Sequence, residues 1–185
     1  MAYLIWLLKI IPSMIVEILA KICSPILALF CDENGWLPDW LAWFRTPDNS
    51  CDGDEAHRKR WPKDGWFWTY ARRTAWLFRN SAYGWNLIMG FKHKEGDVKT
   101  VEGTPEAGDR SGVSGVCHYN VYRDGDRVAF QHYLVKHYRI FGTWRCVRMG
   151  FGYKVWGEPT SKMYGQLWLY FNPIKGSALN DKENA

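Results

Sequence analysis

The chain has 185 residues, of which 47% are hydrophobic and 23% are charged, so it can form a folded core and is neither a disordered chain nor a polytopic membrane protein. Its 12 Trp, 10 Tyr and 9 Phe residues are a surplus that favours contact with something besides its own core. The formal charge of +5 hides basic blocks at residues 56–94 and 127–175, which alternate with acidic blocks. Each basic block predicts a surface for anions, either lipid headgroups or nucleic-acid phosphates.

Residues 3–31 are almost entirely apolar and predict the first element, a hydrophobic helix. Lys9, Ser13, Glu17 and Lys21 recur every four residues and form one narrow polar stripe on it. A spanning helix needs about 20 apolar residues, but each of three charges would cost about 2.5–3.5 kcal/mol at mid-bilayer. We therefore expect membrane association, either in-plane with the stripe facing water or spanning or re-entrant with the stripe against protein. A buried core helix is the alternative.

The membrane-associating segment is expected to occupy residues 1–35. A secretory signal is not predicted, because no basic region precedes the apolar run and no small-x-small cleavage site follows it. The orientation stays open, because only Arg45 is basic within about 20 residues of the end of the segment. The side chains expected to anchor it are Trp6, Leu7, Leu8, Ile11, Ile15, Ile18, Leu19, Ile22, Leu27 and Phe30.

Residues 36–89 are expected to form a Trp-rich turn and then one basic, aromatic helix over residues 66–89. Arginines and rings are interleaved on that helix, which suits a headgroup layer, single-stranded nucleic acid, or an ordinary helix packed over the following β region. The neighbouring hydrophobic segment favours lipid. The predicted interfacial belt comprises Trp36, Trp40, Trp43, Phe44, Trp66, Trp68, Arg72, Arg73, Trp76 and Arg79.

The turn after this Trp-rich run matches a calcium-binding loop only in part. Asp48, Ser50, Asp52 and Gly53 occupy matching positions, but Lys59 stands where the loop needs a bidentate Glu. No metal site is therefore predicted, and these side chains are expected to cap local backbone amides.

Residues 90–115 are expected to be a glycine-rich spacer with room for one short strand, residues 116–175 an antiparallel β region, and residues 176–185 a polar tail. Asp124-Gly125 is a hairpin turn signal. Centring the turn there pairs Arg123 with Asp126, Val121 with Val128, Tyr119 with Phe130, and Cys117 with His132. The predicted fold is α+β, with an N-terminal hydrophobic helix and a Trp/Arg-rich helix followed by a C-terminal antiparallel β-sheet or small sandwich.

The sequence carries no recognisable catalytic motif. Phosphate-binding and dinucleotide glycine loops, H-E-x-x-H and the G-x-S-x-G elbow are all missing from it. Cys117 and His132 are expected to be packing residues, and His118 is expected on the opposite face of its strand. We therefore predict no catalytic, cofactor or metal site, and a protein that acts by binding.

Several motifs resemble an uncharacterised family encoded by tailed bacteriophages, a domain of unknown function. They are Leu37-Pro38 through Trp43-Phe44, Thr46-Pro47-Asp48-Asn49, Asp52-Gly53-Asp54, Arg79-Asn80, Tyr83-Gly84, Gly152-Tyr153-Lys154, Gly157-Glu158-Pro159 and Phe171-Asn172-Pro173. The resemblance covers most of residues 36–175. It implies a phage origin and a bacterial host, and it implies no activity, cofactor or catalytic residue.

Together these observations predict a phage-encoded, membrane-associated binding or accessory protein at the host inner membrane. Its expected partners are host membrane lipids and an unidentified host or phage protein. One alternative is a virion component or scaffold, in the particle or the host cytoplasm, whose helix packs against other subunits. A third hypothesis, less favoured, is a single-stranded nucleic-acid-binding protein.

Overall fold

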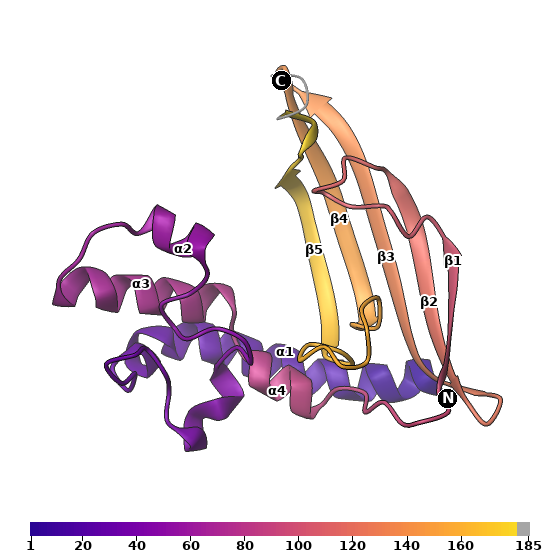
Figure 1. Ribbon diagram of the computed structural model, residues 1–185, viewed down its shortest axis with the longest axis horizontal. Coiled ribbons are helices and arrows are strands. Elements are labelled where there is room, and N and C mark those ends of the chain that lie inside the picture. Colours follow the sequence, from indigo (N-terminus) through magenta and orange to yellow (C-terminus); the bar gives the residue numbers. More distant parts are fainter. Residues whose placement is uncertain (181–185) are drawn as a thin grey trace. The chain divides into compact units, whose positions relative to one another are not determined.

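The computed structural model describes residues 1–180 and confirms the α+β class (Figure 1). The chain forms two compact units. The helical unit is Leu8–Gly90, and the sheet unit combines Met1–Leu7 with the chain from Phe91 onward. The two units are described separately below.

The helices lie in the first half of the chain (Figure 1). They are α1 (Ala2–Ala28), the 3-10 helix η1 (Asp39–Phe44), α2 (Glu55–Arg60), α3 (Trp66–Arg79) and α4 (Tyr83–Ile88). The prediction of a single helix over residues 66–89 is wrong, because α3 ends at Arg79 and the chain turns before α4. The Asn80 side chain donates to the carbonyl of Trp76, an acceptor at the helix end, and Ala82 then adopts a left-handed conformation with φ of 55°.

Helix α1 continues through two prolines, Pro12 and Pro25. Proline has no N–H, so Pro25 leaves the carbonyl of Lys21 without its usual helical donor. The hydroxyl of Ser24 donates to that carbonyl at 2.9 Å. A side chain thus restores the bond that proline removes.

The core of the helical unit joins the end of α1 to the segments that follow it. It is made of Leu27, Ala28, Leu37, Leu41, Cys51, Trp76 and Leu77. Helix α4 packs closely on η1, where a Cβ atom at Gly84 would lie 2.0 Å from the carbonyl oxygen of Ala42. Glycine at this position is what allows the two backbones to approach.

The sheet unit holds a five-stranded antiparallel sheet with its strands in chain order (Figure 1). The strands are β1 (Val98–Gly103), β2 (Gly115–Arg123), β3 (Asp126–Ile140), β4 (Thr143–Tyr153) and β5 (Leu167–Gly176). Of the two predicted arrangements, the described residues form the single sheet. The short strand in the expected spacer is β1, at the edge of that sheet.

The hairpin turn at Asp124-Gly125 is confirmed, since Arg123 is opposite Asp126. A β-bulge between Val121 and Tyr122 then shifts the register by one residue. The predicted pairs Val121–Val128, Tyr119–Phe130 and Cys117–His132 are therefore wrong. A one-residue slip exchanges the faces of a strand, so His118 is opposite His132 and Cys117 is opposite Tyr133. His118 lies on the other face of its strand from Cys117, as predicted, but it shares a face with His132, which corrects the prediction.

Candidate functional site: an outward apolar face and a histidine pair

The helical unit exposes an apolar face along α1 and the turn that follows it. Between Leu8 and Phe30, every exposed residue except Lys21 and Pro25 is a large hydrophobic one. We call this set the outward face; it comprises Leu8, Ile11, Met14, Ile15, Ile18, Leu19, Ile22, Ile26, Leu29 and Phe30. Earlier on the same helix, Leu4, Ile5 and Leu7 are also exposed.

Three of the four residues of the polar stripe of α1, namely Lys9, Ser13 and Glu17, face the protein, while Lys21 is exposed. The hydroxyl of Ser13 is fully buried and accepts a hydrogen bond from Trp85 Nε1 at 3.0 Å. Glu17 accepts one from the Asn86 side chain at 2.7 Å, and Lys9 donates to the carbonyl of Gly90 at 3.3 Å. In a soluble amphipathic helix the apolar stripe packs inward and the polar one faces water. Helix α1 has the reverse arrangement.

The outward face is large enough that its burial would release a substantial free energy. Complete burial of one Leu or Ile side chain is worth about 1.5–3 kcal/mol, and the ten residues of the face are each roughly half exposed. Covering all of them would therefore yield on the order of 10 kcal/mol. Within residues 1–180, α1 is the one helix that could cross a membrane by length and composition, which are properties that signal sequences share.

Eight of the ten predicted anchor residues are exposed. The other two have structural roles. Leu27 belongs to the core of the helical unit. In the sheet unit, Trp6 donates from Nε1 to the carbonyl of Gly152 at 2.9 Å and packs against Phe151.

The predicted belt divides into exposed and buried members. Five are exposed, namely Trp36, Trp40, Trp43, Trp66 and Arg79, while Phe44, Trp68 and Arg72 are half-buried and Arg73 and Trp76 are buried. Trp40 packs edge-to-face on Phe30 with ring centres 5.5 Å apart. Trp66 stacks on Tyr70, whose hydroxyl donates a hydrogen bond to the carbonyl of Pro25. Exposed tryptophans thus gather at the C-terminal end of α1.

Arg72 and Arg73 hold the fold together instead of facing headgroups. Both form ion pairs with Asp52 at 3.0 Å, and Arg73 also donates to the carbonyls of Asp32 and Glu33. Burial alone would raise the pKa of the Asp52 carboxyl, but the hydrogen bonds and charges of Arg73 and Arg72 outweigh it and leave that pKa below its ordinary value. The belt assignment of Arg72, Arg73 and Trp76 is therefore corrected. Sequence spacing gave no signal that Asp52 pairs with residues 20 and 21 positions later.

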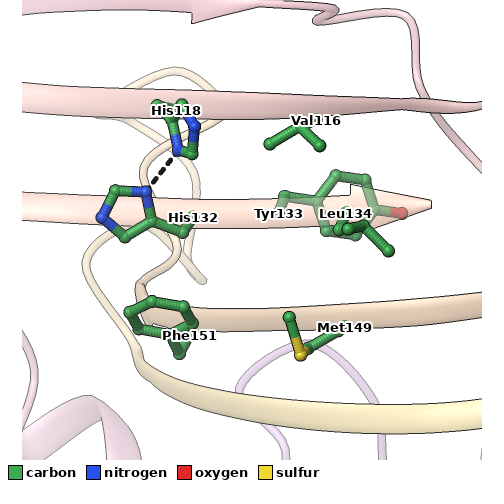
Figure 2. Close-up of a pocket in the computed structure, with 7 residues that line it drawn as sticks. All are labelled: Val116, His118, His132, Tyr133, Leu134, Met149 and Phe151. Atoms are coloured by element: carbon green, nitrogen blue, oxygen red, sulfur yellow. Dashed lines mark hydrogen bonds between the residues drawn. The ribbon is translucent and has the colours of Figure 1, made fainter.

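The sheet unit holds a cavity of about 210 Å³ on the face that carries His118 and His132 (Figure 2). Two rows of cross-strand neighbours run over β2, β3 and β4 on this face. The first row is Val116, Leu134 and Met149, and the second is His118, His132 and Phe151. Figure 2 shows the two imidazoles pointing towards each other, with their Nδ1 atoms hydrogen-bonded. His132 Nε2 also bonds the hydroxyl of Tyr3 at 3.0 Å.

A hydrogen bond between two Nδ1 atoms needs one protonated and one free nitrogen, so one ring of the pair donates and the other accepts. Burial, and then the charges of His118 and Arg127, lower the pKa of His132. Among the described residues, no three His, Cys, Asp or Glu side chains are grouped to hold a metal ion. His132 can therefore respond to pH, but within residues 1–180 the pair lacks the third group of a nucleophilic or metal site.

The single antiparallel sheet and the helix with its apolar side outward define an α+β protein with a candidate membrane-facing surface. The chain belongs to the family of unknown function DUF7338, whose model matches residues 1–179. No curated protein and no solved structure matches the chain.

Proposed function

We propose that this is a membrane-associated binding or accessory protein whose helix α1 lies in the plane of one leaflet. The observation that carries the proposal is the outward face, which runs the length of α1 in the helical unit with Lys21 as its one exposed charge. An interfacial helix buries such a face about 5–10 Å into the boundary between headgroups and acyl chains.

An in-plane helix suits the burial pattern better than a spanning one. The other side of α1 is buried along the helical unit, at Ile10, Ser13, Ala20, Ser24 and Leu27. A helix surrounded by lipid would expose apolar side chains on all sides, whereas α1 offers one side to lipid and one to protein. Lys9, Ser13 and Glu17 of its polar stripe then need neither water nor lipid, because the protein already binds them, and the exposed Lys21 can reach the headgroups.

The proposal includes the origin of the protein and the membrane at which it acts. The motifs that resemble a family encoded by tailed bacteriophages support a phage origin, and hence the host inner membrane as the site of action. The partners would be membrane lipids and a host or phage protein, and the protein would act by binding and not by catalysis.

Fractionation of the tagged protein from host cells tests the proposal. We expect the protein in the membrane pellet after washes with high salt and then alkaline buffer. A variant with Ile15→Asp and Leu19→Asp on the outward face should move to the soluble fraction, since charged groups resist burial in the bilayer. The matched control is Ile140→Asp with Phe141→Asp, two exposed hydrophobic residues at the turn between β3 and β4, which should stay in the pellet.

The same outward face supports one alternative, a virion component or scaffold. Other subunits would then cover the face in place of lipid. Release of the unmodified protein by the alkaline wash, together with its recovery at fixed stoichiometry in purified particles, would favour that function and contradict membrane burial.

A further inference from the structure

The segment from the end of α2 to the start of α3 combines basic side chains with exposed rings. Trp66 is 77% exposed and Phe67 is 60% exposed, which is unusual for rings of this size. The basic side chains next to them are also exposed. We call residues 58–67 the basic aromatic loop; its basic members are Arg58, Lys59, Arg60 and Lys63.

The positive charges of this loop remain available to a partner. Arg58 donates to a backbone carbonyl, that of Gly53, which is an uncharged partner. Lys59 pairs with Glu55, but both side chains are about three-quarters exposed, and such surface pairs are worth little. Lys63 lies 4.4 Å from the centre of the Trp68 ring. Arg72 and Arg73, by contrast, both already pair with the half-buried carboxylate of Asp52.

The loop borders the outward face of α1 within the helical unit. Trp66 stacks on Tyr70 with ring centres 5.8 Å apart, and the Tyr70 hydroxyl donates to the carbonyl of Pro25 at 3.2 Å. Ile22 and Ile26 of the outward face lie within one helical turn of Pro25. Two stacked rings, the exposed Trp66 and the half-buried Tyr70, therefore lie between the apolar face and the basic side chains. In a leaflet, aromatic rings likewise lie between the acyl chains and the phosphates.

We infer that the basic aromatic loop binds the phosphates of anionic phospholipids beside the outward face of α1. This inference rests on the proposed function and adds the lipid class that it selects. The rings of Trp66 and Phe67 enter the interfacial layer, and the Lys and Arg side chains reach the phosphates above it. Each such charge near an anionic surface strengthens binding about fivefold, so three together contribute on the order of 100-fold.

Vesicle co-sedimentation of the full chain tests this inference. The vesicles are phosphatidylcholine alone, or phosphatidylcholine mixed with phosphatidylglycerol. The variant carries Lys59→Gln, Arg60→Gln and Lys63→Gln. Its matched control carries Lys136→Gln, Arg145→Gln and Lys162→Gln, three exposed basic residues of the sheet unit. Both variants lose the same charge.

We expect the unmodified chain and the control to prefer the phosphatidylglycerol vesicles, and the loop variant to lose that preference while still binding phosphatidylcholine. Added salt should weaken the preference as well, because it screens exposed charges. Equal binding of the unmodified chain to both vesicles would overturn the inference and leave the proposed function standing. Failure to bind either vesicle would contradict both. Retention of a single-stranded oligonucleotide that the loop substitutions abolish, without any lipid preference, would assign the loop to nucleic acid and overturn the inference.

Discussion

Replacement of Asp52 by Asn tests whether the arginines of α3 are structural. The Asp52 carboxylate accepts four hydrogen bonds, two from Arg72 and two from Arg73. The Arg73 side chain is only 11% exposed and that of Asp52 20%, so the substitution leaves a buried charge without its partner. Removal of one member of a buried ion pair costs about 3–5 kcal/mol. In a chain of this size we expect the melting temperature to fall by roughly 6–20 °C.

Thermal unfolding followed by circular dichroism measures this loss. The control is Asp39→Asn, because Asp39 pairs with Arg45 at a similar distance of 3.2 Å but is 95% exposed. Surface pairs contribute about 0–1 kcal/mol, so the control should melt close to the unmodified protein. Equal melting temperatures for the two variants would refute the reasoning. The result also bears on lipid binding, since any loss of binding caused by substitutions at Arg72 or Arg73 would reflect unfolding.

Two further predictions concern the histidine pair and the contact between α4 and η1. Because burial and the charges of His118 and Arg127 lower the pKa of His132, the unfolded chain binds a proton at higher pH than the folded chain does. The stability that depends on His132 is therefore fully present above the ordinary value of about 6.5 and is lost as the pH falls below it. Urea unfolding at several pH values should show a smaller acid loss in His132→Gln, and an unchanged loss would contradict this assignment. Gly84→Ala should lower the free energy of unfolding by about 1–3 kcal/mol, because its Cβ would lie 2.0 Å from the Ala42 carbonyl oxygen. Gly157→Ala, where a Cβ meets no atom within 4 Å, should be nearly neutral, and equal urea midpoints for the two glycine variants would argue against close packing of α4 on η1.

The sequence predicted best the features that depend on neighbouring residues. The polar stripe of α1 follows from a spacing of four residues, and the Asp124-Gly125 turn follows from the conformations that these two residues favour. The helix break at Asn80–Ala82 was missed, because aromatic and arginine residues continue on both sides of it with helical spacing. The close approach at Gly84, which no local pattern records, determines where α4 lies.

The sequence by itself determined that α1 has an apolar side too wide for an ordinary surface helix, since hydrophobic periodicity is a property of the residues alone. Only the tertiary structure decided that Ser13 and Glu17 of its polar stripe bind Trp85 and Asn86, some 70 residues away. It also decided that Asp52 pairs with Arg72 and Arg73, and that a bulge brings His118 and not Cys117 opposite His132. The physical reason is the same in each case: these pairings depend on which distant segments pack together, and a shift of one residue or one turn exchanges the partners.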